Sequence, residues 1–278
     1  MESYYPNKAM MSPMNSLKTE GIKRLFVALI STFAMLASQT ACTASSLPPY
    51  EAEYTTKMRG LRINSDRKFI EIGENTYRLS WKAKALWMRI SEWSDFEIVD
   101  DQIRPISYHY TRKGLGSDRP IHIEFDWENM QAKGSKGDKE YTFTLDSNSL
   151  DRLSFQVQMQ LDLINDKTLK EFNYRIANYN GMRDYRFEFE KNESVDTRIG
   201  TFDTLVFKRD KKDSTIRLWM SPKQFYLPVK VQQTGDDANT VVIRGWKSEK
   251  EHDETLPSIN KSNLIESDDN NTRANEEF

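Results

Sequence analysis

The sequence predicts a mainly β protein with one helix: a strongly curved antiparallel sheet, a half-barrel or incomplete barrel, with the helix packed on its concave face. Three observations lead to this fold class. Short segments of alternating apolar and polar residues follow one another along most of the chain. Turn residues separate them, without the long crossovers that parallel strands need, so neighbours in sequence should pair antiparallel. Only one segment has helical periodicity.

The first half of the chain contains strand patterns only. Glycine, asparagine and aspartate mark the turns, at residues 59–60, 73–75, 100–101, 114–118 and 134–138. Strands are predicted at residues 50–58, 62–71, 76–85, 87–99, 106–111, 121–127 and 140–145.

The helix is predicted at residues 149–165. Asn148 or Ser149 can cap its start, and Asp151 lies where the helix dipole favours an anion. The apolar face is broader than a surface helix needs, which indicates a helix lying against or inside a curved sheet. Its residues recur at steps of three and four: Leu150, Leu153, Val157, Leu161 and Ile164.

Strand patterns resume after the helix. They cover residues 171–178, 183–193, 204–209 and 216–220, then a strand that opens at Leu227, and finally residues 240–246. About ten or more strands are therefore expected in one sheet.

Three short motifs in this second half resemble a known family. The first motif, G-x-F-x-x-L-x-x-x-R, is formed by Gly200, Phe202, Leu205 and Arg209. The second, L-W-x-x-P, is formed by Leu218, Trp219 and Pro222. The third, Y-L-P-V, is formed by residues 226–229. Residues 150–154 are similar to a further short helix start, although Arg152 stands where proline is often found. The pattern resembles DUF3108, a bacterial envelope domain of unknown function, over roughly residues 50–247. The resemblance implies a fold and a compartment but no reaction.

The ends of the chain differ from its middle. Residues 1–44 are expected to be an N-terminal extension and a signal peptide, because the basic pair Lys23-Arg24 precedes an apolar run at 25–37. Residues 45–247 are expected to form a single DUF3108-like β domain. Residues 248–278 are acidic, rich in asparagine and poor in apolar residues, and are expected to be a disordered tail.

The only cysteine, Cys42, decides between two ways of processing the signal. The favoured one is cleavage after Ala44, which gives a soluble periplasmic protein. The alternative is lipidation of Cys42 and an outer-membrane lipoprotein, although Gln39 stands where leucine is usual. No transmembrane span is expected in the mature form, because the apolar run is shorter than the about 20 residues that a span needs, and a retained membrane anchor is the alternative.

The chain offers little for catalysis. His109 and His122 lie on predicted strands, and with Glu124 or Asp126 they could form a metal site or a general base. No spacing signature supports this, so exposed or cross-strand-paired histidines are expected. No catalytic residue, cofactor or metal is predicted. With 40 basic and 42 acidic residues, no nucleic-acid partner is predicted.

The tryptophans and the helix suggest a binding function instead. A sheet curled around one helix can leave a groove lined by rings, suited to a lipid or other apolar ligand or to an envelope protein. The alternatives are an envelope scaffold with a filled core and a hydrolase that uses Asp or His on the concave face. The candidate ligand-binding residues are Trp81, Trp87, Trp93, Val157, Leu161 and Trp219.

Overall fold

The computed structural model describes residues 47–58, 60–86, 88–114, 119–236 and 238–248. These residues belong to one compact unit. The expected signal peptide, the Cys42 site, the Trp87 side chain and residues 249–278 lie outside the described residues. Within the described ranges, no helix is long and apolar enough to cross a membrane.

The predicted fold class is confirmed: the described part of the chain is mainly β, with one α-helix and a single sheet that does not close into a barrel. Its helical elements are α2 (Ser154–Asn165) and the 3-10 turn η1 (Pro222–Gln224). The strands are β1 (Tyr50–Met58), β2 (Leu61–Gly73), β3 (Thr76–Ala85), β4 (Met88–Val99), β5 (Gln102–Lys113), β6 (Ile121–Asp126), β7 (Gln131–Lys136), β8 (Lys139–Thr144), β9 (Ser149–Leu150), β10 (Glu171–Asn178), β11 (Gly181–Thr197), β12 (Gly200–Lys211), β13 (Ser214–Ser221), β14 (Leu227–Gln233) and β15 (Asn239–Ser248).

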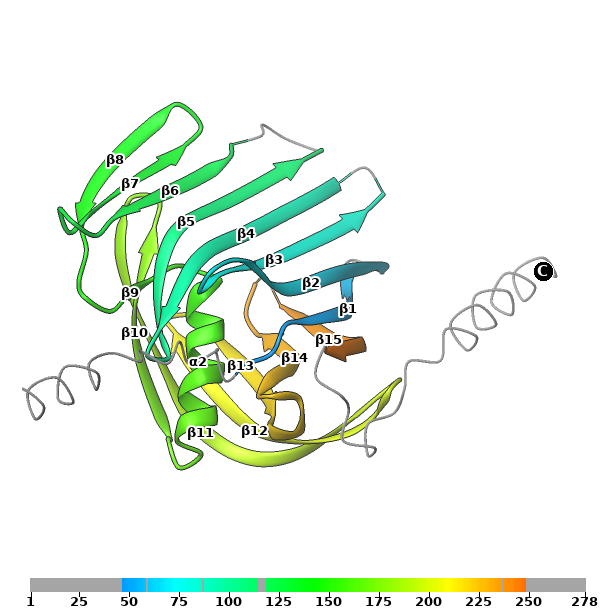
Figure 1. Cartoon of the computed structure of the whole chain (residues 1–278). Coiled ribbons are helices and arrows are strands. Elements are labelled where there is room, and N and C mark those ends of the chain that lie inside the picture. Colours follow the sequence, from blue (N-terminus) through cyan, green and yellow to red (C-terminus); the bar gives the residue numbers. More distant parts are fainter. Residues whose placement is uncertain (1–46, 59, 87, 115–118, 237, 249–278) are drawn as a thin grey trace, which may run out of the picture. The chain divides into compact units, whose positions relative to one another are not determined.

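The strands follow one another in the sheet almost as they do in the chain. Their order runs from β8 back to β1, then to β15, and from β15 back to β9. All neighbours are antiparallel except the short pair β9 and β10. The first and last strands therefore lie side by side in the middle of the sheet, and β8 and β9 are its edges (Figure 1).

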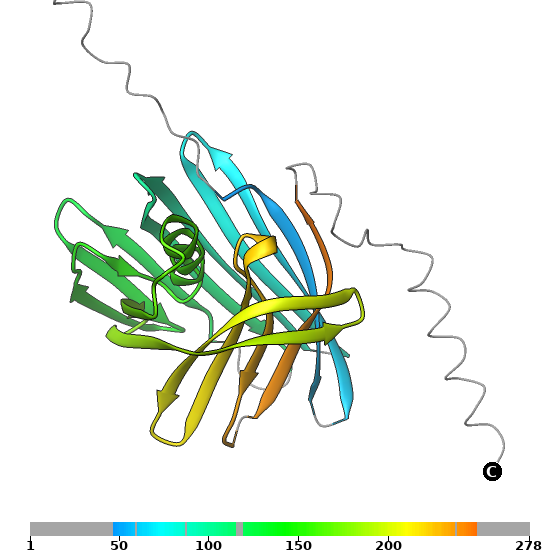
Figure 2. The same cartoon turned by 90° about the horizontal axis from the view of Figure 1, so that it is seen from below.

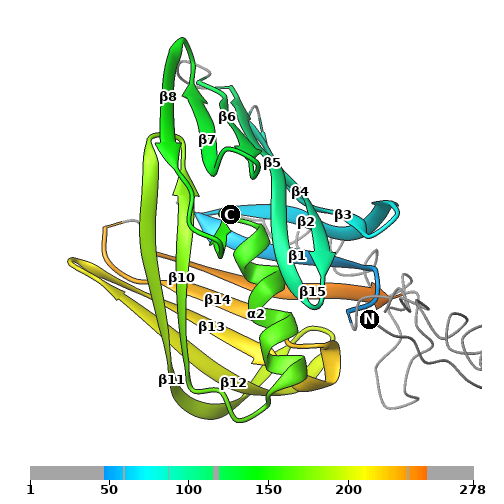
Figure 3. The same cartoon turned by 60° about the vertical axis from the view of Figure 1, so that its left-hand side comes forward.

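Helix α2 lies inside the curve of the sheet, as predicted (Figure 3). Its side chains are buried on more than one face: Phe155, Val157, Met159, Leu161 and Leu163 are all at least nine-tenths buried. Two glutamines anchor it through backbone groups of distant segments. Gln158 accepts a hydrogen bond from the Ile103 amide, and Gln160 donates one to the Phe225 carbonyl.

The hairpin of β11 and β12 belongs to the sheet, since β12 pairs with β13 over residues 205–211, and the far end of the hairpin extends as a second layer on the outer side of the sheet. In Figure 2, which is seen from below, this end of the hairpin crosses in front of β14 and β15, and β11 contacts β15. Val206 and Trp219 are cross-strand neighbours on β12 and β13, and both are buried. This outer layer explains why side chains of both orientations are buried along β12.

Two local predictions were wrong. The helix begins at Ser154 and not at Ser149, because Ser149 and Leu150 pair with β10 and the Asp151 carboxylate accepts the Leu153 and Ser154 amides. Residues 134–136 belong to strand β7 and not to a turn. A Cβ on Gly134 would lie 2.1 Å from the Tyr179 carbonyl oxygen, so the glycine is needed for close approach.

Candidate functional site

Two adjoining hollows lie between α2 and the concave face of the sheet. Their volumes are about 370 and 300 Å³, within or near the range of small-molecule sites. They share four lining residues, so they are described together as the concave groove: Arg152, Gln156, Pro228 and Val231.

Apolar side chains form most of the groove wall. The first hollow is lined by α2, β11, β12, β13 and β14, and the second by α2 and strands on either side of the β1–β15 pair. The first contains Phe155, Met159, Phe187, Ile216, Leu218 and Met220. The second contains Tyr54, Trp81, Leu153 and Val241.

Arg67 is the most unusual residue of the groove. It is 5% exposed and lines the second hollow. Its Nε donates to the Tyr50 hydroxyl at 2.9 Å and its Nη1 to the Gln156 side-chain oxygen at 2.5 Å. Both partners are neutral, and the buried Nη2 has no hydrogen-bond partner among the described residues. The guanidinium is therefore buried with one side unsatisfied.

Glu92 is the single acidic residue of the groove wall. It accepts a hydrogen bond of 2.5 Å from the Tyr108 hydroxyl, and the Arg152 Nε lies 3.7 Å from its carboxylate. Burial, and then the negative charge of Glu92, raise the pKa of Tyr108, so the phenol remains a donor. Glu92 is thus already engaged by two neighbours.

Arg209, the last residue of the first family motif, lines the other end of the groove. Its guanidinium lies over the Tyr185 ring, 3.5 Å from the ring centre. Burial lowers the pKa of Arg209, although an arginine remains a cation at neutral pH. Together with Arg67, Arg152 and Lys211 it gives the groove four cationic side chains against one carboxylate.

Asp151 serves the start of α2 and does not line the groove. Its carboxylate is fully buried and accepts the Ser94 hydroxyl at 2.5 Å, in addition to two backbone amides. Burial raises the pKa of Asp151 to about 6, and the hydrogen bonds from Ser94 and the amides oppose this shift.

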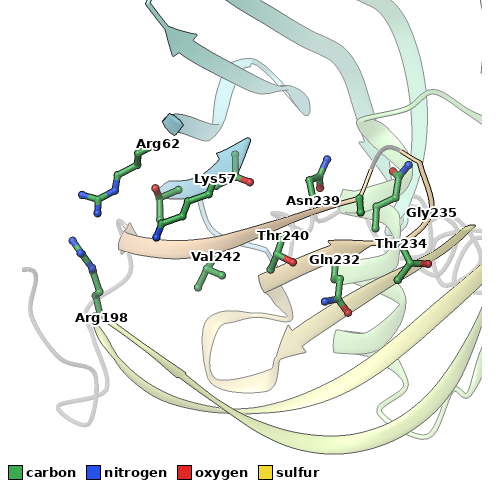
Figure 4. Close-up of a pocket in the computed structure, with 13 residues that line it drawn as sticks. Lys57, Arg62, Arg198, Gln232, Thr234, Gly235, Asn239, Thr240 and Val242 are labelled. Atoms are coloured by element: carbon green, nitrogen blue, oxygen red, sulfur yellow. The ribbon is translucent and has the colours of Figure 1, made fainter. Parts of the chain in front are cut away.

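A larger hollow, of about 650 Å³, lies outside the concave groove. Figure 4 shows Lys57, Arg62 and Arg198 gathered at one end of it, and Gln232 and Asn239 toward the other. These three cations are exposed, so water and salt screen their charges. The concave groove, where a cation is buried, is therefore the stronger candidate site.

The two histidines lie away from the groove. His109 and His122 face each other across β5 and β6, with their Nδ1 atoms 3.0 Å apart, and Trp93 stacks on His109. The other nitrogen of His122 contacts Glu124 at 2.9 Å. Burial, then the neighbouring His122, lower the pKa of His109. Within the described ranges, no group of three His, Cys, Asp or Glu residues could hold a metal ion.

The residues predicted to bind a ligand are distributed over the structure. Trp81 lines the concave groove. Trp93 has the opposite orientation to Glu92 along β4 and stacks on His109, and Trp219 lies between the sheet and the outer hairpin. Val157 and Leu161 are fully buried and do not line either hollow. Trp87 and Cys42 lie outside the described residues.

The sequence analysis did not identify the charged residues of the groove as site residues, although the pattern of β2 indicates one of them. Along β2 the buried positions are Ile63, Ser65, Arg67 and Phe69. Strand alternation places Arg67 on the same face as two apolar residues. An arginine at an inward position of an alternating strand is therefore a sign of a buried charge.

Comparisons with known proteins support the fold and the family. No curated protein matches this chain. A crystal structure from Brucella abortus, described as a β-barrel-like protein of domain of unknown function DUF1849, aligns with a TM-score of 0.50 over 74% of this chain and 100% of that chain. The identity is 10%, so this likeness shows the fold alone.

The model of the family described as "Protein of unknown function (DUF3108)" matches residues 49–243. This range includes the three motifs of the second half, and it confirms the resemblance that they indicated. Because the match covers more than half of the chain, the protein belongs to the DUF3108 family.

Proposed function

We propose that this protein is exported to the periplasm and binds an apolar ligand, such as a lipid chain, in the concave groove. The observation that carries the proposal is the groove itself: two adjoining hollows of about 370 and 300 Å³, with mainly apolar walls, next to a helix whose other side chains are tightly packed. Pockets of this size and composition are typical ligand sites.

Binding is favoured over hydrolysis by the place of the polar residues. His109 and His122 pair with each other away from the groove, and Asp151 holds the start of α2. The carboxylate in the groove, Glu92, accepts a hydrogen bond from Tyr108. A scaffold with a filled core is the remaining alternative, and a direct binding measurement distinguishes it from a protein that binds an apolar ligand.

The test uses the neutral fluorophore N-phenyl-1-naphthylamine, which fluoresces in apolar surroundings. We expect the wild-type protein to bind it and Val231→Trp to bind about tenfold or more weakly, because Val231 lines both hollows and a tryptophan there fills them. Ile106→Trp is the matched control, since Ile106 is an exposed residue of β5 outside the groove. If the fluorophore does not bind to the wild-type protein, the proposed ligand binding is wrong and the scaffold is favoured.

Export is supported by the basic pair at residues 23–24 and the apolar run at 25–37. Cell fractionation should find the processed protein in the periplasm, and a full-length chain in the cytoplasm would contradict export. Labelled palmitate tests the alternative: incorporation that disappears in Cys42→Ser would assign the protein to the lipoproteins.

A further inference from the structure

The buried guanidinium of Arg67 contacts neutral groups, and the negative charge of Glu92 in the same hollow acts on it only from a distance. Among the described residues it forms no ion pair, and its two hydrogen bonds go to the neutral Tyr50 and Gln156. Tyr50 in turn donates to Gln160, so the chain of hydrogen bonds continues through neutral groups. An arginine stays charged at any physiological pH, so folding buries a full positive charge here.

Such an arrangement is costly for the protein alone. Removing an unpaired charge from water costs several kcal/mol, and a buried donor without an acceptor adds to this cost. The charge of Glu92 offsets part of this cost from a distance, but its carboxylate accepts the Tyr108 hydroxyl, lies near Arg152 and forms no ion pair with Arg67. The groove wall carries a further half-buried cation, Arg209, and Glu92 is its single carboxylate.

We infer that the ligand of the concave groove is an anionic amphiphile, whose carboxylate or phosphate headgroup is held by Arg67 while its apolar chain lies along α2. This inference rests on the proposed function and names its class of ligand. The Nη2 of Arg67 is buried and has no partner among the described residues, so a headgroup in the second hollow would reach it when the side chains around it move apart. Guanidinium groups bind carboxylate and phosphate oxygens through charge-assisted hydrogen bonds.

The walls of the groove fit the two parts of such a molecule. Arg67 and Arg152 line the second hollow, where the headgroup would lie. The first hollow shares Arg152 and Gln156 with it and continues past Met159 and Leu218, which offer apolar surface to a chain. Arg152 is 49% exposed, so it stands where a headgroup would enter from solvent.

The experiment compares molecules with the same dodecyl chain and different headgroups. Dodecanoate, dodecyl phosphate, dodecanol and dodecyltrimethylammonium are each used to displace N-phenyl-1-naphthylamine from the wild-type protein. We expect both anions to displace it at concentrations about tenfold lower than the neutral and cationic molecules. Equal displacement by all four would overturn the inference. Inorganic phosphate, which lacks a chain, should not raise the unfolding temperature, and stabilisation equal to that by dodecyl phosphate would point to an ion site instead.

Arg67→Met removes the charge and keeps an apolar side chain. We expect it to lose the preference for anions, so that dodecanoate and dodecanol displace the fluorophore from this variant at similar concentrations. Arg78→Met is the matched control, because Arg78 already forms two hydrogen bonds with Asp95, and it should keep the preference. If Arg67→Met does not fold, the wild-type comparison still decides whether the groove prefers an anionic headgroup.

The two proposals fail in different ways. If the wild-type protein binds the neutral fluorophore but shows no headgroup preference, the groove binds apolar molecules and the role of Arg67 is wrong. If neither the fluorophore nor any dodecyl compound binds, the proposed function itself is wrong.

Discussion

Arg67 and Glu92 occupy inward positions of strands that otherwise carry apolar or small residues at those positions. On β4 the buried positions are Glu92, Ser94, Phe96 and Ile98. Buried charges are expensive, so charges that face a core usually have a dedicated partner or a function. Glu92 has its partners within the chain, whereas Arg67 is left with a vacant donor. This difference at single residues carries the inference of an anionic ligand.

Asp151 makes the stability of the folded protein depend on pH. Its pKa is about 6 in the folded protein, above the usual value of about 3.9 in an unfolded chain. The folded state therefore binds the proton more tightly, and its contribution to stability is present at low pH and is lost as the pH rises through about 6. We expect the difference in unfolding free energy between wild type and Asp151→Asn to fall by about 2 kcal/mol between pH 4 and pH 7.

Urea unfolding at several pH values measures this difference. Asp126→Asn is a control of opposite sign, because hydrogen bonds from the Asn129 side chain and amide lower the pKa of Asp126. The unfolding free energy of the wild type minus that of Asp126→Asn should rise with pH. A pH-independent difference for Asp151→Asn would show that the carboxyl group titrates normally in the folded state.

At the scale of elements, alternation predicted most strands because their apolar residues recur at every second position. It failed for β7, Gln131–Lys136, where Ala132 is the single apolar residue and Gly134 imitates a turn. The position of the helix depended on a competition that periodicity does not show. Ser149 and Leu150 continue the helical pattern, yet they pair with β10.

The groove was harder to predict than the sheet. Helical periodicity identifies one apolar stripe, but α2 has buried side chains on more than one face. Val157 and Leu161, which belong to the stripe, pack into the core, whereas Phe155 and Met159 line the groove. Tryptophan content does not reveal orientation either: Trp81 lines the groove, whereas Trp219 lies under the outer hairpin. Only the register of each strand separates these cases.

Gly134 allows β7 to approach the turn between β10 and β11. The Tyr141 and Tyr179 rings meet edge to face at 5.7 Å, and Lys136 lies over the Tyr179 ring. We expect Gly134→Ala to lower the free energy of unfolding by about 1–3 kcal/mol, because its methyl group would collide with the Tyr179 backbone.

Gly73→Ala is the matched control for this change, measured by the same urea unfolding. Its added Cβ would meet Thr76 at an ordinary 3.6 Å. Its stability should stay unchanged or rise slightly, because alanine restricts the unfolded chain. Equal effects of the two substitutions would show that β7 and the Tyr179 turn are not held at the close distance.

At the scale of the whole domain, the two ends of the described chain meet in the centre of the sheet. β1 pairs with β15 over most of its length, and β15 also pairs with β14. The Tyr50 and Trp246 rings lie 5.7 Å apart, and Ile243 is 1% exposed. Strand β15 therefore joins the two halves of the sheet, and one core connects them.

This arrangement predicts that stability depends sharply on where the chain is cut. Deleting residues 249–278 should leave cooperative urea unfolding with an unchanged midpoint, because that segment has too few apolar residues to offset the entropy of ordering. Deleting residues 239–278 also removes β15 and should abolish the cooperative transition, because β1 and β14 would each lose a partner in the middle of the sheet. A cooperative transition in the protein that ends at residue 238 would show that the two halves of the sheet fold without β15. A lost transition in the protein that ends at residue 248 would show that residues 249–278 contribute to the core.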